Sequence, residues 1–112
     1  MALLRPIKAG SSYRVTYRAD AGSGGASLLV VFWIPKEGSD VPHPRETEIA
    51  PANEGAISGT VPAFEAVRRI EIRLDIPDAS GSGTLTLEVD GEEHKSSEVD
   101  ADTTWTTIVL RA

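Results

Sequence analysis

The chain has 112 residues, 40% of them hydrophobic, which suits one domain with a single modest core over residues 1–112. Its 17 acidic residues outnumber its 11 basic ones, so the formal net charge is −6. This balance argues against nucleic acid or an anionic membrane as a partner, because both require a basic surface. The chain has no cysteine, which excludes disulfides, zinc–thiolate sites and thiol catalysis.

The beginning of the chain has no long apolar stretch of the kind found in signal peptides. No run approaches the ~20 apolar residues that a membrane-spanning helix requires. The sequence as it stands therefore predicts a cytoplasmic protein. If the chain is a domain cut from a longer secreted protein, the expected location is extracellular instead.

Strands are predicted from the start of the chain. Residues 3–7 can form a short strand, which Pro6 confines to the edge of a sheet. Residues 13–19 alternate between apolar and polar positions, which is typical of a half-buried strand. Residues 27–34 are apolar on both faces, so we expect a central strand that is covered on both sides.

The middle of the chain is more polar. Residues 36–45 predict a loop that Pro42 and Pro44 hold extended. Short strands are expected at residues 46–50 and 56–61.

The clearest amphipathic strand covers residues 68–76, where aliphatic side chains alternate with charged ones. Residues 84–89 alternate in the same way and lead into Asp90 and Gly91, a pair that strongly favours a tight β-hairpin. In the predicted strand at residues 68–76, the inward residues are expected to be Ile70, Ile72, Leu74 and Ile76.

The last part of the chain begins with residues 92–97, a charged run that suits a short edge strand. Residues 98–103 predict an acidic connection, and residues 104–110 a final strand. Together these elements predict an all-β domain, a single antiparallel β-sandwich of seven to nine strands. Its topology is expected to be jelly-roll-like or, alternatively, immunoglobulin-like.

The sequence offers little support for catalysis. Its two histidines, His43 and His94, are not framed by a nucleophile motif, and the acidic residues near the hairpin are expected to be exposed. The domain is therefore predicted not to be an enzyme, with a small hydrolase as the third alternative. No cofactor or metal site is predicted, although alternating acidic residues at 98–102 leave structural calcium open.

Four segments together resemble the jelly-roll β-sandwich of carbohydrate-binding modules and galactose-binding-like domains. This resemblance implies a non-catalytic binding module. The segments are Tyr13-Arg14-Val15-Thr16-Tyr17 with the run 28–33, Gly59-Thr60-Val61-Pro62, the row from Ile70 to Ile76, and Gly83-Thr84-Leu85-Thr86-Leu87.

Glycan binding is the first functional hypothesis, because a tryptophan at a strand end can present a flat face to a sugar ring. The alternative is a protein–protein or structural assembly role, with a homodimer as one form of it. Core packing is the competing interpretation of both tryptophans. The candidate ligand-binding residues are Trp33, Trp105, His43, Arg45, Asp100 and Asp102.

Overall fold

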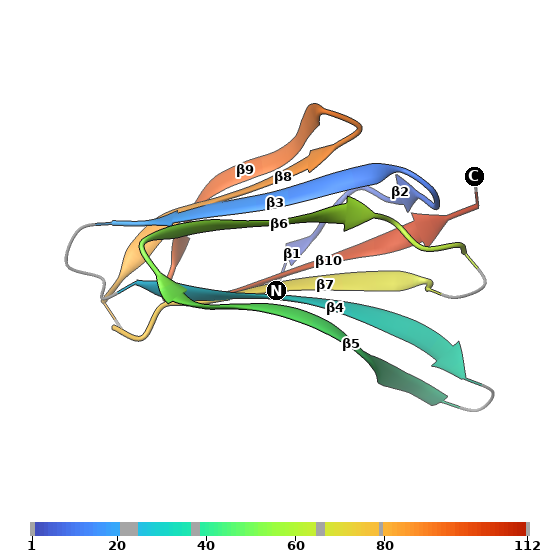
Figure 1. Ribbon diagram of the computed structural model, residues 1–112, viewed down its shortest axis with the longest axis horizontal. Coiled ribbons are helices and arrows are strands. Elements are labelled where there is room, and N and C mark those ends of the chain that lie inside the picture. The colour runs from blue at the N-terminus through green and yellow to red at the C-terminus, as the bar shows by residue number, and fades with distance from the viewer. Residues whose placement is uncertain (1, 21–24, 37–38, 65–66, 79, 112) are drawn as a thin grey trace.

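The computed structural model describes residues 2–20, 25–36, 39–64, 67–78 and 80–111, and only the backbone of residues 2, 34–36 and 39–52. The described residues form ten strands and no helix, and eight of the strands have seven or more residues (Figure 1). The strands are β1 (Ala2–Leu3), β2 (Ile7–Lys8), β3 (Ser12–Ala19), β4 (Ala26–Lys36), β5 (Ser39–Ala52), β6 (Glu54–Thr60), β7 (Arg69–Asp75), β8 (Ser82–Val89), β9 (Glu92–Asp100) and β10 (Asp102–Leu110).

The strands form two sheets that lie one above the other (Figure 1). The larger sheet has the order β1-β10-β7-β4-β5, with β2 also pairing with β10, and the smaller sheet has the order β6-β3-β8-β9. The two-residue strands β1 and β2 run parallel to β10, whereas the other neighbours are antiparallel. Among the eight longer strands, the chain changes sheets at every connection except the hairpins β4–β5 and β8–β9. The two packed, mostly antiparallel sheets confirm the predicted β-sandwich.

The core lies between the sheets and is made by alternate residues of each strand. The inward side chains of β7, Ile70, Ile72 and Leu74, are at most 3% exposed, as the alternation predicted. They share the core with Val15 of β3 and Leu85 of β8. Complete burial of one such aliphatic side chain contributes about 1.5–3 kcal/mol, so these rows hold the two sheets together.

Strand β4 occupies the inner position predicted for it, between β7 and β5. Its inward residues Leu28 and Val30 are at most 1% exposed. On its outer face Val31 is also buried, whereas Leu29 and Trp33 are half-buried. The outer face of the larger sheet is therefore partly covered by its own side chains.

The predicted polar loop at residues 36–45 is wrong, because the structure continues there as β5. Pro42 and Pro44 lie within this strand. Proline cannot donate a ladder hydrogen bond, but β5 is the last strand of its sheet, where one side of the backbone has no partner strand among the described residues. The prolines therefore mark an edge strand where the sequence suggested a loop.

The predicted hairpin at Asp90 and Gly91 is confirmed. Both residues have positive φ angles, 52° and 80°, as the favoured two-residue turn between β8 and β9 requires. A Cβ atom on Gly91 would meet nothing within 4 Å, so the turn needs glycine for its conformation and not for space.

The predicted acidic connection at residues 98–103 is wrong, because most of it is strand. Strand β9 continues to Asp100 and β10 begins at Asp102, which leaves Ala101 as the connecting residue. Val99 is 8% exposed and packs in the core, and this burial explains why the strand persists through an acidic stretch.

Candidate functional site

The two predicted tryptophans lie on opposite faces of the larger sheet. Trp105 lies opposite Ile72 on the inner face and is only 3% exposed. Its assignment to a ligand site is therefore corrected: it is a core residue, because the alternation of β10 directs it between the sheets. Trp33 of β4 is half-buried on the outer face, where a ligand can reach it.

The acidic residues predicted for the same site are exposed but lie at the other end of the sheet. Asp102 is opposite Asp75, and Asp75 is opposite Ser27 at the beginning of β4. Trp33 follows Ser27 by six positions, which corresponds to about 20 Å along a strand. Asp100, the last residue of β9, lies near the same end. The structure does not bring these carboxylates and Trp33 together.

The remaining predicted residues, His43 and Arg45, lie in β5 beside Trp33. Glu46 pairs with Val31 and Pro42 with Trp33, so residues 43–45 form a bulge opposite a single position of β4. Their side chains lie outside the described residues. The backbone of His43 and Arg45 therefore lies next to Trp33, as predicted, but no side-chain contact is described.

Trp33 belongs to a connected group with three outward residues of β7, which we call the Trp33 cluster: Trp33, Arg69, Glu71 and Arg73. The Arg69 guanidinium lies over the indole, 4.3 Å from the ring centroid. The indole Nε1 donates a hydrogen bond of 2.8 Å to Glu71 Oε2, and Arg73 Nε donates one of 2.7 Å to Glu71 Oε1. The sheet register creates the cluster, because Trp33 is opposite Arg69 and the three β7 residues share one face.

Electrostatics favour the ionised form of Glu71. Burial raises the pKa of its carboxyl, but hydrogen bonds from Arg73 and Trp33 and the charges of Arg73 and Arg69 outweigh it. The pKa therefore lies below its ordinary value of 4.5. The Nε of Arg69 is buried without a hydrogen-bond partner in the described structure, so its interactions there are the stacking on Trp33 and the charge of Glu71.

A second aromatic group closes the adjoining end of the sandwich. The guanidinium groups of Arg68 and Arg111 lie 5.3 and 5.1 Å from the centroid of the Phe64 ring. The Arg68 amide also donates to the Trp33 carbonyl oxygen at 3.2 Å, so the backbones of the two groups are neighbours. We call the Trp33 cluster together with Phe64, Arg68 and Arg111 the arginine–aromatic surface.

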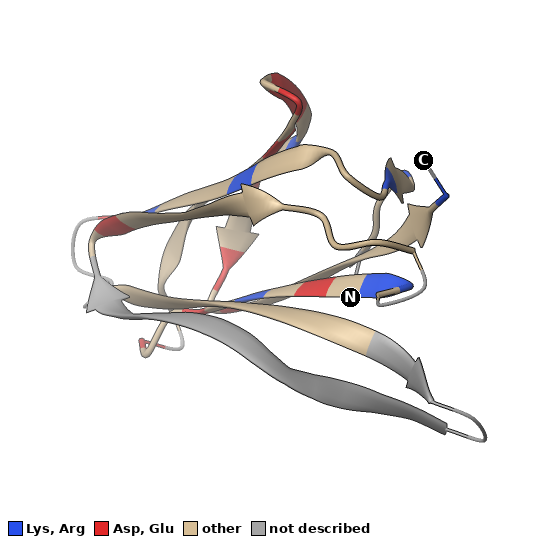
Figure 2. Ribbon diagram, turned by 45° about the vertical axis from the view of Figure 1, so that its right-hand side comes forward, with Lys and Arg blue, Asp and Glu red and all other residues tan. Residues whose placement is uncertain are grey.

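Apolar and basic side chains border this surface. Ile108 lies opposite Arg69 and is 45% exposed, and Leu110, which is 44% exposed, lies beside Lys8 of β2. Figure 2 shows basic segments on the same side of the molecule at β2, at the beginning of β7 and at the end of the chain, whereas the tip of the β8–β9 hairpin is acidic. An acidic protein thus presents a locally basic, partly apolar surface.

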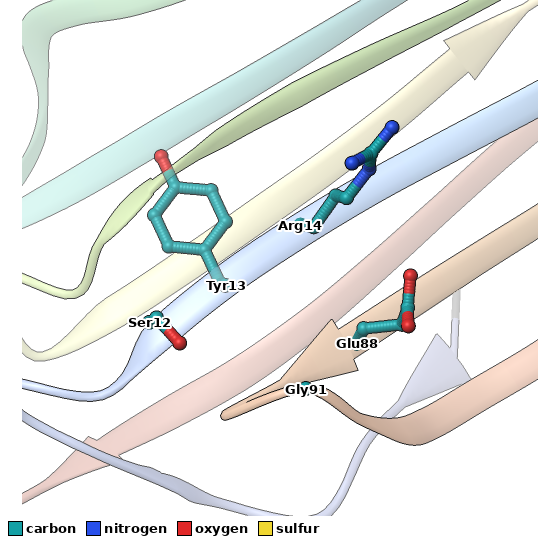
Figure 3. Close-up of a pocket in the computed structure, with 5 residues that line it drawn as sticks. All are labelled: Ser12, Tyr13, Arg14, Glu88 and Gly91. Atoms are coloured by element: carbon teal, nitrogen blue, oxygen red, sulfur yellow. The ribbon is translucent and has the colours of Figure 1, made fainter.

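Two open hollows flank the β8–β9 hairpin. One, of about 320 Å³, lies over the smaller sheet, where Figure 3 shows Arg14 and Glu88 on neighbouring strands above Ser12 and Gly91. Tyr13, which also lines it, is 8% exposed and packs in the core. The hollow therefore offers no exposed ring to a ligand.

The other hollow, of about 380 Å³, contains His94 together with Glu92 and Glu93. His94 Nε2 lies 2.8 Å from the carbonyl oxygen of Arg5 and must donate to it, because a carbonyl oxygen only accepts. Arg5 Nη2 donates in return to the His94 carbonyl oxygen at 3.3 Å. In this arrangement His94 holds the N-terminal segment against β9.

Within the described part of the chain, no group of three or more histidine, aspartate or glutamate residues could hold a metal ion. The same residues include no helix long and apolar enough to cross a membrane. Structural calcium stays a prediction.

Comparisons of the chain with protein-family models, with curated proteins and with solved structures found no match. The case for a site therefore rests on its own geometry. Arg69, Glu71 and Arg73 are charged positions of the amphipathic strand that the sequence predicts at residues 68–76. Their alternation predicts that they share one face of the strand. Their contact with the Trp33 indole could not be predicted, because it depends on the pairing of β4 with β7.

Proposed function

We propose that this domain is a non-catalytic binding module and that its ligand is a glycan bearing carboxylate groups. The observation that carries the proposal is the Trp33 cluster, a half-buried indole held on an open sheet face between Arg69 and Glu71. The ligand would bind across the arginine–aromatic surface.

The chemistry of the cluster suits such a ligand. A sugar ring presents C–H groups that pack on an indole, and a carboxylate accepts hydrogen bonds from guanidinium groups. The Arg73 side chain is 47% exposed, so it can donate to a ligand, and the Arg69 guanidinium beside the indole adds a positive charge. The indole is already fixed by Glu71, so binding would lose little side-chain entropy there.

The charge distribution supports an anionic ligand. The whole chain carries a formal charge of −6, which repels anions from most of its surface. Arg69 and Arg73 lie in the Trp33 cluster, and Arg68 and Arg111 lie over the Phe64 ring. A local basic surface on an acidic protein attracts and orients an anionic partner at that place.

A protein partner with an acidic segment is the second candidate. The observation that favours it is the exposure of Leu3, Ile108 and Leu110, at 71%, 45% and 44%, along β1 and β10. Tryptophan and arginine are enriched among the residues that dominate protein interfaces, and exposed aliphatic side chains mark docking surfaces.

The test is a titration with oligogalacturonate and, in parallel, with a neutral glucan oligosaccharide of equal length, followed by tryptophan fluorescence. Trp105 is buried, so a change on binding reports mainly Trp33. We expect the acidic oligosaccharide to bind and added salt to weaken binding. Arg69→Gln should reduce affinity at least about tenfold, the effect of losing one charged hydrogen bond.

Arg14→Gln is the matched control, because Arg14 is exposed on the smaller sheet. Equal binding by the Arg69→Gln and Arg14→Gln variants would contradict the proposed site. Binding of an acidic peptide in an Arg69-dependent way, without binding of either oligosaccharide, would favour the protein partner instead.

A further inference from the structure

Strand β6 is an edge whose outward backbone groups have no partner strand among the described residues. The Ser12 carbonyl accepts from the Asp90 amide and the Ser12 amide donates to the Asp90 side chain, so Ser12 faces β8. Because the backbone N–H and C=O groups of successive residues point to opposite sides of a strand, those of Tyr13, Val15 and Tyr17 point to β6.

The residues of β6 that receive them are Gly59, Ile57 and Gly55. The backbone amide and carbonyl groups of the even-numbered β6 residues therefore point away from β3, toward the open edge of the sheet. These residues are Glu54, Ala56, Ser58 and Thr60, and all four are exposed.

The other described edges are protected in ways that β6 is not. Strand β9 carries Glu92, Glu93, Lys95 and Glu98, and charged side chains discourage pairing with another chain. Strand β5 contains three prolines and a bulge, and β1 and β2 have two residues each. Strand β6 has neither proline nor a register shift, and its one charged residue stands at its first position.

We propose that β6 pairs antiparallel with β6 of a second copy, about a twofold axis at Ile57. This register places Ala56 opposite Ser58 of the other copy, and Glu54 opposite Thr60. Even-numbered residues thus meet even-numbered residues, which are the ones whose backbone groups point outward. The pairing would join two four-stranded sheets into one continuous sheet of eight strands.

The same register avoids electrostatic conflict. Each Glu54 faces an uncharged threonine at the far end of the partner strand, so no like charges lie opposite each other. A twofold axis requires a self-complementary surface, and the strand fulfils this with glycine at both 55 and 59 and small residues at both 56 and 58.

The inner face of β6 holds the strand in a shape suited to pairing. A Cβ atom on Gly55 would lie 2.9 Å from the Tyr17 ring, and one on Gly59 would lie 3.2 Å from the Tyr13 hydroxyl. The tyrosine side chains thus fill the space beside both glycines, and Ile57 between them is 5% exposed. Packing along the whole inner face fixes the strand, so pairing would order little additional chain.

The first experiment measures mass by sedimentation equilibrium between about 1 μM and 1 mM, a range that covers weak to moderate dimers. The wild-type mass should rise from 11.9 kDa toward twice that value. Ser58→Pro removes an outward amide without removing a hydrogen bond to β3, so it should weaken dimerisation at least about tenfold. Ser96→Pro on the β9 edge is the matched control and should dimerise like the wild type.

A second experiment tests the register without proline. The chain has no cysteine, and directly opposed residues of an antiparallel pair have Cα atoms close enough for a disulfide. The double variant Ala56→Cys with Ser58→Cys should give a reducible dimer on mild oxidation, and Ala56→Cys alone should give little. A wild type that stays monomeric at 1 mM, or equal cross-linking of both variants, would overturn the proposal.

Discussion

The two faces of the larger sheet use the same strands in different ways. On the inner face, Ile72 of β7 lies opposite Trp105 in the core, and both are at most 3% exposed. On the outer face, Glu71 of the same strand is linked to Trp33 by a hydrogen bond and to Arg73 by an ion pair. One tryptophan therefore serves the core and the other serves an accessible cluster.

The comparison shows that alternation in a strand assigns each residue to a face but does not say what the face does. The inner row is stabilised by burial, which is not directional and depends on area. The outer row depends on directed contacts between neighbouring strands, which are strong only when partners are placed at the right distance and angle. The inner face should therefore dominate stability and the outer face should dominate recognition.

The largest expected difference is between the two tryptophans. Trp105→Ala should destabilise the domain by about 3–5 kcal/mol, because it leaves a large cavity between the sheets. Trp33→Ala should cost no more than about 2 kcal/mol, since it removes a half-buried ring and one hydrogen bond to a charged group. Urea unfolding measures both, and a greater loss in the Trp33 variant would reverse the assignment of the two faces.

A matched pair of isoleucines sharpens the comparison. Ile72→Ala on the inner face should cost about 2–5 kcal/mol. Ile108→Ala on the outer face should stay near the scatter of surface substitutions, about 0.5 kcal/mol, because Ile108 is 45% exposed. Thermal unfolding distinguishes the two, and similar losses would show that the outer face is covered in solution.

The next expected effect concerns Glu71 and depends on pH. Because its folded-state pKa is lowered, its ionised form stabilises the fold above its ordinary pKa of 4.5, and this contribution is lost as the pH falls through the folded-state value. Glu71→Gln should therefore cost about 1 kcal/mol at pH 7 and less in acid. The measurement is urea unfolding of both proteins at pH 7 and pH 3, and a difference that grows in acid would contradict the assigned sign.

Local signals in the sequence predicted much of this fold. The alternation of residues 13–19 and 70–76 gave the correct inward faces, and the pair Asp90–Gly91 gave the hairpin. These features depend on a strand's own period or on the conformational freedom of a few residues, so they can be read without knowing any partner.

Features that depend on neighbours could not be predicted in the same way. The prolines of β5 suggested a loop, because the sequence does not show that the strand lies at an edge. Trp105 was predicted as a site residue because the sequence does not show that the opposite sheet buries its side chain. Of the predicted site residues, Trp33 alone has a described side chain in the arginine–aromatic surface. The partners of Trp33 lie in β7, and Arg69, the residue opposite Trp33, is 36 positions later in the sequence.

The parallel pairing of β1 and β2 with β10 has a mechanical consequence. A force that pulls Ala2 and Leu110 apart runs along both strands in opposite directions, so it shears the contacts between them instead of opening them one after another. Backbone hydrogen bonds from Leu4 to Thr106 and from Ala9 to Leu110, each 2.8 Å long, would share that load. Single-molecule stretching should therefore show a higher rupture force between these two points than across the β8–β9 hairpin, whose ladder would open from one end.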